Sequence, residues 1–222
     1  MFPLRDTQPS YSKPVVTVLL IAINILVFLY ELSLDDYSQN AFVAAYALVP
    51  EHFQLVNVLT SMFLHGGWMH VLGNMWFLWI FGDNIEDILG HTKYLGFYLL
   101  CGVVAAMTQV VFSFYSRVPM VGASGAIAGV MGAYMVKFPH SRIRTAVFFI
   151  FILFTDIPAW VMLIYWFAIQ LFSGVGSLGD TQANQGGTAF FAHIGGFIAG
   201  IVLVNVMGAR ERYSSRRDLY WR

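Results

Sequence analysis

The sequence has little charge and almost no cysteine. Lysine, arginine, aspartate and glutamate together make up 11% of its 222 residues, whereas a soluble domain carries about 25%. The single cysteine, Cys101, lies within an apolar run, which excludes a disulfide framework and a cysteine metal cluster. Basic and acidic residues balance at 12 each, so no basic excess points to a nucleic-acid partner.

Apolar side chains, in contrast, are abundant. Hydrophobic residues form 58% and aromatic residues 17% of the chain, and the mean hydropathy is +0.67. A spanning helix needs roughly 20 apolar residues, fewer or more with tilt and local thinning. We therefore expect an all-α, polytopic membrane protein with six spanning helices, at residues 14–32, 68–82, 92–114, 123–138, 157–173 and 188–208.

The fifth of these helices follows an interrupted stretch. The apolar run from Arg144 to Ser173 is too long for one ordinary helix, and the sequence Asp156-Ile157-Pro158 breaks it. The residues before that break are too few to span a bilayer. The sequence therefore predicts an interfacial or re-entrant segment at 145–154.

Lysine and arginine predict the orientation of the helices. With six spans and a cytoplasmic N-terminus, eleven of these residues fall on the cytoplasmic side and one, Arg117, falls outside, which fits the positive-inside rule. Both termini are then cytoplasmic. The predicted organisation is a cytoplasmic segment at 1–13, a six-helix membrane domain at 14–208 and a basic cytoplasmic tail at 209–222 that can contact anionic lipid.

Ser124 is expected to lie below the outer membrane surface. Residues 123–137 cover about 22 Å as a helix, whereas the hydrocarbon core is about 30 Å thick. With Lys137 at the inner surface, the serine cannot reach the outer one. The irregular chain before it must then line a water-filled depression, because bare backbone facing lipid is too costly.

Polar side chains lie inside three predicted helices, where they are costly and by default suggest function. His70 and Asn74 share one face of the second helix, Ser124 begins the fourth and His193 lies in the sixth. Next to Ser124 and His193 run stripes of small residues, which let helices approach closely; they contain Gly125, Gly129, Ala192, Gly196 and Gly200.

If these stripes pack together, His193 could take the hydroxyl proton of Ser124 while the serine attacks a carbonyl. The resulting oxyanion would need donors, and His70, the Asn74 amide and the Ser124 backbone N–H are available. Because no membrane-embedded acid is available to orient His193, the residues predict a Ser124–His193 dyad without metal or cofactor.

Three motifs resemble those of the rhomboid family of intramembrane serine proteases. LTSMFLHGGWMHVLGN at 59–74 resembles the family signature HxxxxHxxxN and contributes His65, His70 and Asn74. GASG at 122–125 resembles GxSG, and AHIGGFIAG at 192–200 resembles AHxxG. The resemblance implies a six-helix bundle with a catalytic serine and histidine at Ser124 and His193, supported by Gly122, Gly125, His65 and Gly196.

The resemblance also implies the substrates, which are transmembrane-anchored proteins cleaved near the outer membrane boundary after entry between the second and fifth helices. The bilayer itself is the other expected partner. The compact chain favours a prokaryotic plasma membrane, with an organelle as the alternative. The active site is expected to face the outer side.

The sequence departs from the family at two places. Many relatives carry Trp-Arg where this chain has Val56-Asn57, which leaves open how that loop is anchored. Some relatives place a tyrosine on the catalytic histidine at the position of Ala128, so other packing must hold His193 here.

Two other functions stay open. A metal or solute transporter could use His65, His70 and His193, although zinc usually takes three or four histidine, cysteine or carboxylate ligands. A catalytically inactive rhomboid-like protein could bind membrane clients, although such relatives typically lose the serine or the histidine, and this chain has both.

The remaining polar and aromatic side chains have simpler interpretations. The carboxylates at the inner end of the second helix are expected to be solvated: Asp83, Glu86 and Asp87. Tryptophans are expected at the membrane interfaces or facing lipid: Trp68, Trp76, Trp79 and Trp166. A further hypothesis gives Trp166 and Phe77 a part in a lateral gate.

Overall fold

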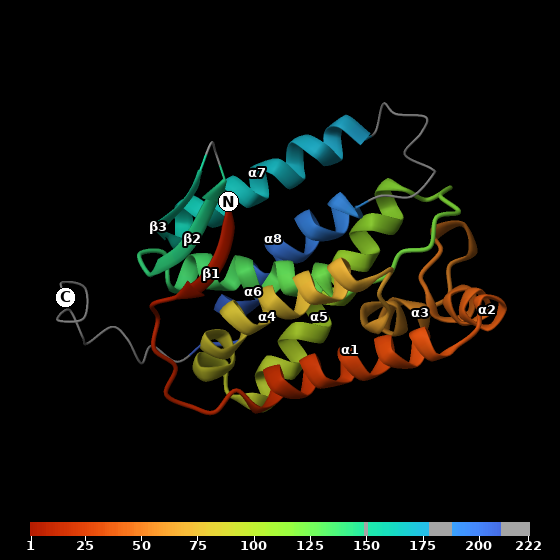
Figure 1. The fold of residues 1–222 in the computed structure, drawn as a ribbon, viewed down its shortest axis with the longest axis horizontal. Helices are drawn as coiled ribbons and strands as arrows, with labels where there is room; N and C mark the ends of the chain where they lie inside the picture. Colours follow the sequence, from red (N-terminus) through yellow and green to blue (C-terminus); the bar gives the residue numbers. More distant parts are fainter. Residues whose placement is uncertain (149–150, 178–187, 210–222) are drawn as a thin grey trace.

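The computed structural model describes residues 1–148, 151–177 and 188–209, and most of them are helical (Figure 1). The α-helices are α1 (Val15–Ser33), α2 (Asp36–Tyr46), α3 (Asn57–Thr60), α4 (Trp68–Leu89), α5 (His91–Phe112), α6 (Ser124–Lys137), α7 (Ala159–Ser177) and α8 (Phe190–Val206). Two 3₁₀ turns and three strands make up the remaining regular elements of the described residues: Pro50–His52, Ser61–Phe63, β1 (Phe2–Asp6), β2 (Arg142–Phe148) and β3 (Ile152–Pro158).

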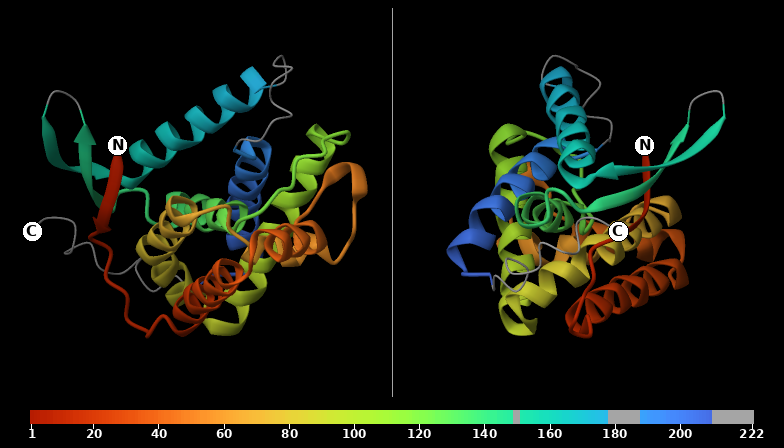
Figure 2. Two further views of the ribbon diagram at one scale, coloured as in Figure 1. Left: turned by 45° about the vertical axis from the view of Figure 1, so that its right-hand side comes forward. Right: turned by 90° about the vertical axis from the view of Figure 1, so that its left-hand side faces the viewer.

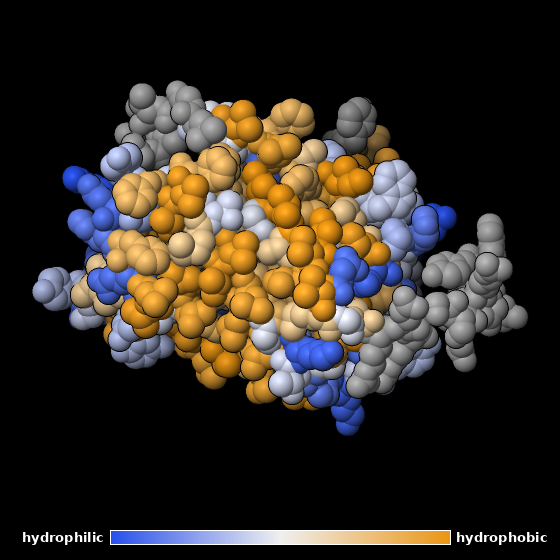
Figure 3. Space-filling view, turned by 180° about the vertical axis from the view of Figure 1, so that it is seen from behind, coloured by the Kyte–Doolittle hydropathy of each residue, from blue (hydrophilic) through white to orange (hydrophobic). Residues whose placement is uncertain are grey.

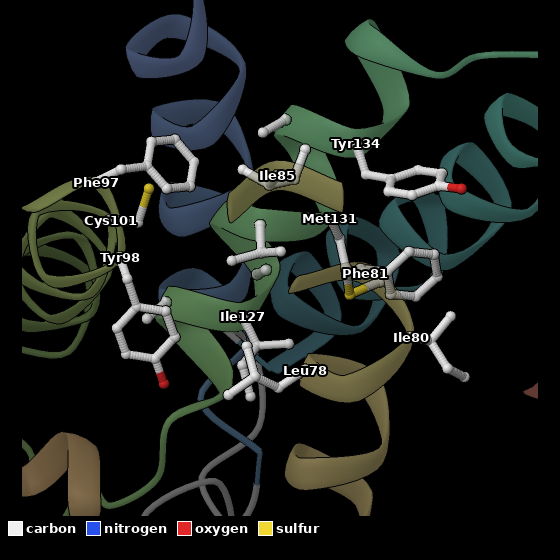
Figure 4. Packing of buried hydrophobic residues seen from close by; sticks show 14 of the residues in the cluster. Leu78, Ile80, Phe81, Ile85, Phe97, Tyr98, Cys101, Ile127, Met131 and Tyr134 are labelled. Carbon is white, nitrogen blue, oxygen red and sulfur yellow. The ribbon is translucent and has the colours of Figure 1, made fainter. Parts of the chain in front are cut away.

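Helix α6 is the centre of the bundle. It packs against α4, α5, α7 and α8, and the right-hand view of Figure 2 shows it nearly end-on among them. Figure 4 shows how its apolar side chains pack between those of α4 and α5. The residues in that contact are Leu78, Phe81 and Ile85 of α4, Phe97, Tyr98 and Cys101 of α5, and Ile127, Met131 and Tyr134 of α6, all fully or almost fully buried.

The six predicted helices correspond to α1, α4, α5, α6, α7 and α8. By length and composition, three of the described helices could cross a membrane, namely α1, α5 and α7. Helix α8 has 17 residues and α6 has 14, while α4 carries polar side chains along its length. Figure 3 shows a broad hydrophobic surface with hydrophilic residues toward both ends. The count of six spans and the orientation of the termini stay predictions.

The predicted helical fold is confirmed in the main, but the all-α class is too strict, because a three-stranded antiparallel sheet in the order β1-β2-β3 lies at one end of the bundle (Figure 1). Strand β1 comes from the predicted cytoplasmic segment 1–13. Of the predicted interfacial or re-entrant segment 145–154, residues 145–148 belong to β2 and residues 152–154 to β3, while 149–150 lie outside the described residues. Valine, isoleucine, threonine and phenylalanine favour strands, and ladder pairing satisfies the backbone. A short apolar run alone does not distinguish a strand from a buried helical or re-entrant segment.

The N-terminal segment is fixed to the bundle by side-chain hydrogen bonds. The Tyr134 hydroxyl of α6 donates to Asp6 Oδ2 at 2.6 Å, and Trp76 Nε1 of α4 donates to the Pro3 carbonyl at 2.7 Å. Trp76 is therefore a packing residue as well as a partly exposed one. The basic tail predicted at 209–222 lies outside the described residues except for Ala209.

The prediction of a solvated carboxylate end on α4 was wrong for Glu86 and Asp87, whereas Asp83 is partly exposed. Glu86 and Asp87 are buried. Glu86 accepts from the backbone N–H groups of Val16 and Thr17, each at 2.8 Å, and Asp87 accepts from that of Ser12 at 2.9 Å. The first N–H groups of a helix lack partners within it, and a carboxylate there also interacts favourably with the helix dipole. These two acids therefore fix the start of α1.

The stripes of small residues on α6 and α8 pack directly against each other. A Cβ atom built on Gly196 would lie 2.0 Å from the Gly125 carbonyl oxygen, and one on Gly200 would lie 1.8 Å from that of Gly129. These positions hold glycine because the two backbones touch. The contact brings the N-terminal half of α6 against the middle of α8.

We expect Gly200→Ala to destabilise the bundle by at least about 2 kcal/mol, because α6 and α8 must separate to admit the methyl group. Gly96→Ala is the matched control, since a Cβ there meets nothing within 4 Å. It should leave stability unchanged or raise it by roughly 0.5–1 kcal/mol. Unfolding midpoints of the detergent-solubilised variants measure both effects, and equal midpoints would contradict the close contact.

Candidate active site

Ser124 is the first residue of α6, and the chain before it is held in place by backbone contacts. Gly122 has a φ of +119°, a conformation that favours glycine, and its N–H donates to the Ser61 carbonyl at 2.8 Å. Met120 pairs with Leu48 in an isolated β-bridge. The first N–H groups of a helix have no intrahelical acceptor, so the backbone N–H of Ser124 is a donor directed out of the helix end.

His193 of α8 lies beside this serine. Its Nε2 atom is 2.8 Å from Ser124 Oγ, and its Nδ1 atom is 2.7 Å from Gln170 Oε1 of α7. An amide oxygen accepts and does not donate, so Nδ1 carries the proton and Nε2 is left to accept from the serine hydroxyl. The structure therefore brings the predicted Ser124 and His193 together in the geometry of a nucleophile and its base.

His70 and Asn74 of α4 face the same place. The Gly66 N–H donates to His70 Nδ1 at 3.4 Å, which leaves Nε2 as the protonated, donating nitrogen. A Cβ on Gly122 would lie 2.6 Å from that Nε2 and 3.5 Å from Asn74 Nδ2. Both donors therefore lie against the chain that leads into Ser124, and only a residue without a side chain fits there.

These four side chains line a cavity of about 1010 Å³. Ser124, His70, Asn74 and His193 are among its polar groups, beside others such as Gln109, Ser113 and Ser116, and part of the wall is apolar. The wall includes Phe77 of α4 and Trp166 of α7, so the two residues of the gate hypothesis border the cavity, and the gate stays a hypothesis. The cavity supplies room for a peptide segment beside the serine.

His65 connects the site to α1. Its Nε2 atom is 3.0 Å from Asn74 Nδ2, and its backbone N–H donates to the Glu31 carboxylate at 3.4 Å. Both His65 and Glu31 are buried. Asn74 donates an amide hydrogen to His65, which fixes the orientation of the amide that faces the cavity. His65 thus contacts Asn74 from the side of α1. The two other predicted supporting residues, Gly125 and Gly196, lie in the α6–α8 contact.

The loop that lacks Trp-Arg is anchored in another way. Asn57, at the second of those two positions, is buried and donates from Nδ2 to the Ala47 carbonyl at 2.8 Å. Arg117, in the chain between α5 and α6, forms a bidentate ion pair with Glu51. The Asn57 contact holds this loop to itself, and the Arg117–Glu51 pair joins it to the chain between α5 and α6.

Sequence reasoning missed two polar partners of the site, Gln170 and Glu31. Gln170 could have been found as a buried-type amide inside an otherwise apolar predicted helix, but only acids were considered as partners of His193. Glu31 lies at the end of the first helix, about 34 positions from His65, and no local pattern indicates that pairing. The packing that replaces tyrosine at Ala128 is supplied by Trp166, whose ring centroid is 5.7 Å from that of His193.

Together, the fold and the site define a helical membrane protein with a serine–histidine pair beside a cavity. A family profile of the Rhomboid domain matches residues 52–210. The chain belongs to the rhomboid family.

Three relatives illustrate the range of the family. Rhomboid protein 1, mitochondrial, of Saccharomyces cerevisiae is 26% identical over 169 residues, which are 72% of this chain and 45% of that protein. Rhomboid protease GluP of Bacillus subtilis is 35% identical over 129 residues, 56% of this chain and 25% of that protein. Presenilin-associated rhomboid-like protein, mitochondrial, of Homo sapiens is 35% identical over 88 residues, which are 39% of this chain and 23% of that protein.

The chain thus spans less than half of the length of these relatives. Two of them are mitochondrial by name, and the third comes from a bacterium. The prediction of a prokaryotic plasma membrane therefore gains no support from them.

We expect His65 to make the stability of the protein depend on pH. Burial, and next the neighbouring His70, lower the pKa of His65 from 6.5 to about 4. Between these two pKa values the unfolded chain binds a proton at His65 that the folded chain does not. The contribution of neutral, buried His65 to the free energy of unfolding is therefore complete above pH 6.5 and is lost as the pH falls toward 4.

Relative to His65→Gln, the wild type should lose up to about 1.4 kcal/mol of unfolding free energy per pH unit in that range. Glutamine keeps an acceptor for Asn74 but does not titrate. Denaturant unfolding of both proteins at several pH values measures the difference. The same pH slope in both would contradict a buried, neutral His65.

Proposed function

We propose that the chain is an intramembrane serine endopeptidase, which hydrolyses peptide bonds in or near the transmembrane segments of membrane-anchored proteins. The observation that carries this proposal is the 2.8 Å contact between His193 Nε2 and Ser124 Oγ. Membership of a family that includes a relative named as a protease supports it.

The reaction begins with attack of Ser124 Oγ on the carbonyl carbon of the scissile peptide bond. His193 Nε2 takes the hydroxyl proton as the C–O bond forms. It then gives this proton to the amide nitrogen as the C–N bond breaks, which leaves an acyl-enzyme and a free amine. Water, with His193 again as base, hydrolyses the ester and restores the serine.

The negative charge that develops on the carbonyl oxygen needs donors already in place. His70 Nε2–H, the Asn74 amide and the Ser124 backbone N–H are the candidates, since all three border the same cavity. The start of α6 adds a partial positive charge at the serine. These groups come from two helices that pack together, α4 and α6.

The composition of the cavity wall fits a membrane-anchored substrate. The 1010 Å³ volume admits water and a peptide segment, and apolar side chains of α4, α6 and α7 line part of it, including Phe77, Met131 and Trp166. The positive-inside pattern supports a site on the outer side of the bilayer. The proposed partners are therefore transmembrane proteins and the lipid around them.

The alternative functions have less support. Metal transport needs three or more histidine, cysteine or carboxylate ligands grouped together, and the described part of the chain has no such group. Client binding without chemistry does not require a serine hydroxyl beside an imidazole nitrogen, whereas hydrolysis does.

We expect Ser124→Ala and His193→Ala to abolish cleavage of a fluorescent transmembrane substrate by the purified protein in liposomes. Ser124→Ala removes the nucleophile, and His193→Ala removes its base. A serine-directed phosphonate should label the wild type and leave Ser124→Ala unlabelled. Cleavage by Ser124→Ala at the wild-type rate would sink the proposal, as would activity that is lost with a chelator and restored by a metal ion.

We expect His70→Ala and Asn74→Ala each to lower kcat on the order of 10²-fold or more, because each removes one donor to the oxyanion. Asn205→Ala is the matched control, since that amide pairs with Lys137 far along α8 from the serine. Its kcat should equal that of the wild type. Steady-state kinetics on the same substrate measure all three, and an unchanged kcat in both His70→Ala and Asn74→Ala would remove them from the oxyanion site.

A further inference from the structure

Gln170 is a buried amide in an apolar helix, and it contacts the proposed base. The residue is 8% exposed, and its Oε1 atom accepts from His193 Nδ1 at 2.7 Å. A buried amide without a partner is costly, so the contact with His193 accounts for glutamine at this position in α7. Trp166, one helical turn earlier on the same face, packs against the same imidazole.

Helix α7, which carries Gln170, is held close to α8 near that residue. A Cβ atom on Gly174 of α7 would lie 3.2 Å from Phe190 Cβ and 3.5 Å from Ile194 Cδ1 of α8. The small residue lets the two helices approach one turn beyond Gln170. The position of the amide oxygen relative to His193 is therefore set by helix packing rather than by a free side chain.

We propose that Gln170 is the positioning residue of the base: its amide oxygen holds the Nδ1–H of His193, so that Nε2 faces Ser124 as an acceptor. This inference rests on the proposed function of the Ser124–His193 pair. The Nδ1 proton stays on the imidazole throughout the reaction, and Nε2 gains and returns the serine proton. The amide takes no proton and stabilises the imidazolium by its dipole alone.

Gln170 acts on His193 and not on the substrate. The described residues that line the cavity include Trp166 and His193 but not Gln170. Among the charged and titratable groups of the described helices, His70 of α4 is the one that faces His193 across the cavity. Loss of the amide should therefore change the catalytic step and leave substrate binding as it was.

The test compares Gln170→Leu with Gln170→Glu in the full-length protein in liposomes. Leucine removes the acceptor at similar volume, so kcat should fall on the order of 10- to 100-fold with KM within about twofold of the wild type. Glutamate keeps an oxygen acceptor and should rescue kcat. Where that carboxyl is ionised, it favours the imidazolium and moves the acid limb of the pH–kcat profile to higher pH.

Leu163→Ala controls for packing, because Leu163 is fully buried on the same helix and is not among the described residues that line the cavity. It should lower the unfolding midpoint while leaving the shape of the pH–kcat profile unchanged. If Gln170→Leu does not fold, Gln170→Glu carries the test alone. A Gln170→Glu profile identical to that of the wild type then overturns the inference.

The outcomes separate this inference from the proposed function. A wild-type kcat in folded Gln170→Leu, with Ser124→Ala inactive, overturns the role of Gln170 and leaves the serine mechanism intact. Cleavage by Ser124→Ala overturns the proposed function itself. A kcat loss in Gln170→Leu that Gln170→Glu reverses, at constant KM, is the result that we expect.

Discussion

The backbone contact between α6 and α8 is the constraint on which the site depends. Gly196 and Gly200 of α8 let the two helices approach until a single methyl group on either would overlap a carbonyl of α6. At ordinary helix separations of 8–10 Å, side chains fill the space between two axes. Between α6 and α8 no side chains separate the two backbones at the glycine positions. The short side chain of Ser124 therefore reaches His193 Nε2. Larger residues in either stripe would separate α6 from α8 and so lengthen the distance between Ser124 Oγ and His193 Nε2.

Several buried polar groups are paired with one another at the two ends of α1, because an unpaired polar group in a low-dielectric interior is costly. Near the cavity, Glu31 of α1 accepts from the His65 backbone and His65 pairs with Asn74. At the opposite end of α1, Glu86 accepts from its first N–H groups. Helix α1 is therefore held at both ends by carboxylate contacts, while much of its middle is exposed.

The helices and the central residues of the site were accessible from sequence, because each leaves a local signal. Apolar runs of spanning length predicted α1, α5 and α7, and small-residue spacing predicted the α6–α8 contact. Two features could not be predicted from the sequence. The β2–β3 hairpin is an apolar run whose strand partner, β1, begins more than 130 positions earlier. Gln170 and Glu86 differ from ordinary polar residues only through partners on other helices, which pattern reasoning along one helix does not reveal.

The choice of an amide rather than a carboxylate next to His193 follows from the surroundings of α7. This helix exposes apolar side chains on one side, among them Ile164, Ile169 and Phe172, and a carboxylate placed near lipid would carry a large desolvation cost unless it were paired. An amide orients the imidazole through the same Nδ1–H contact without a net charge. It stabilises the imidazolium less than a carboxylate would. Under the proposed mechanism, the amide gives the transition state less electrostatic stabilisation than a carboxylate would, but it avoids the desolvation cost of a charge beside exposed apolar side chains.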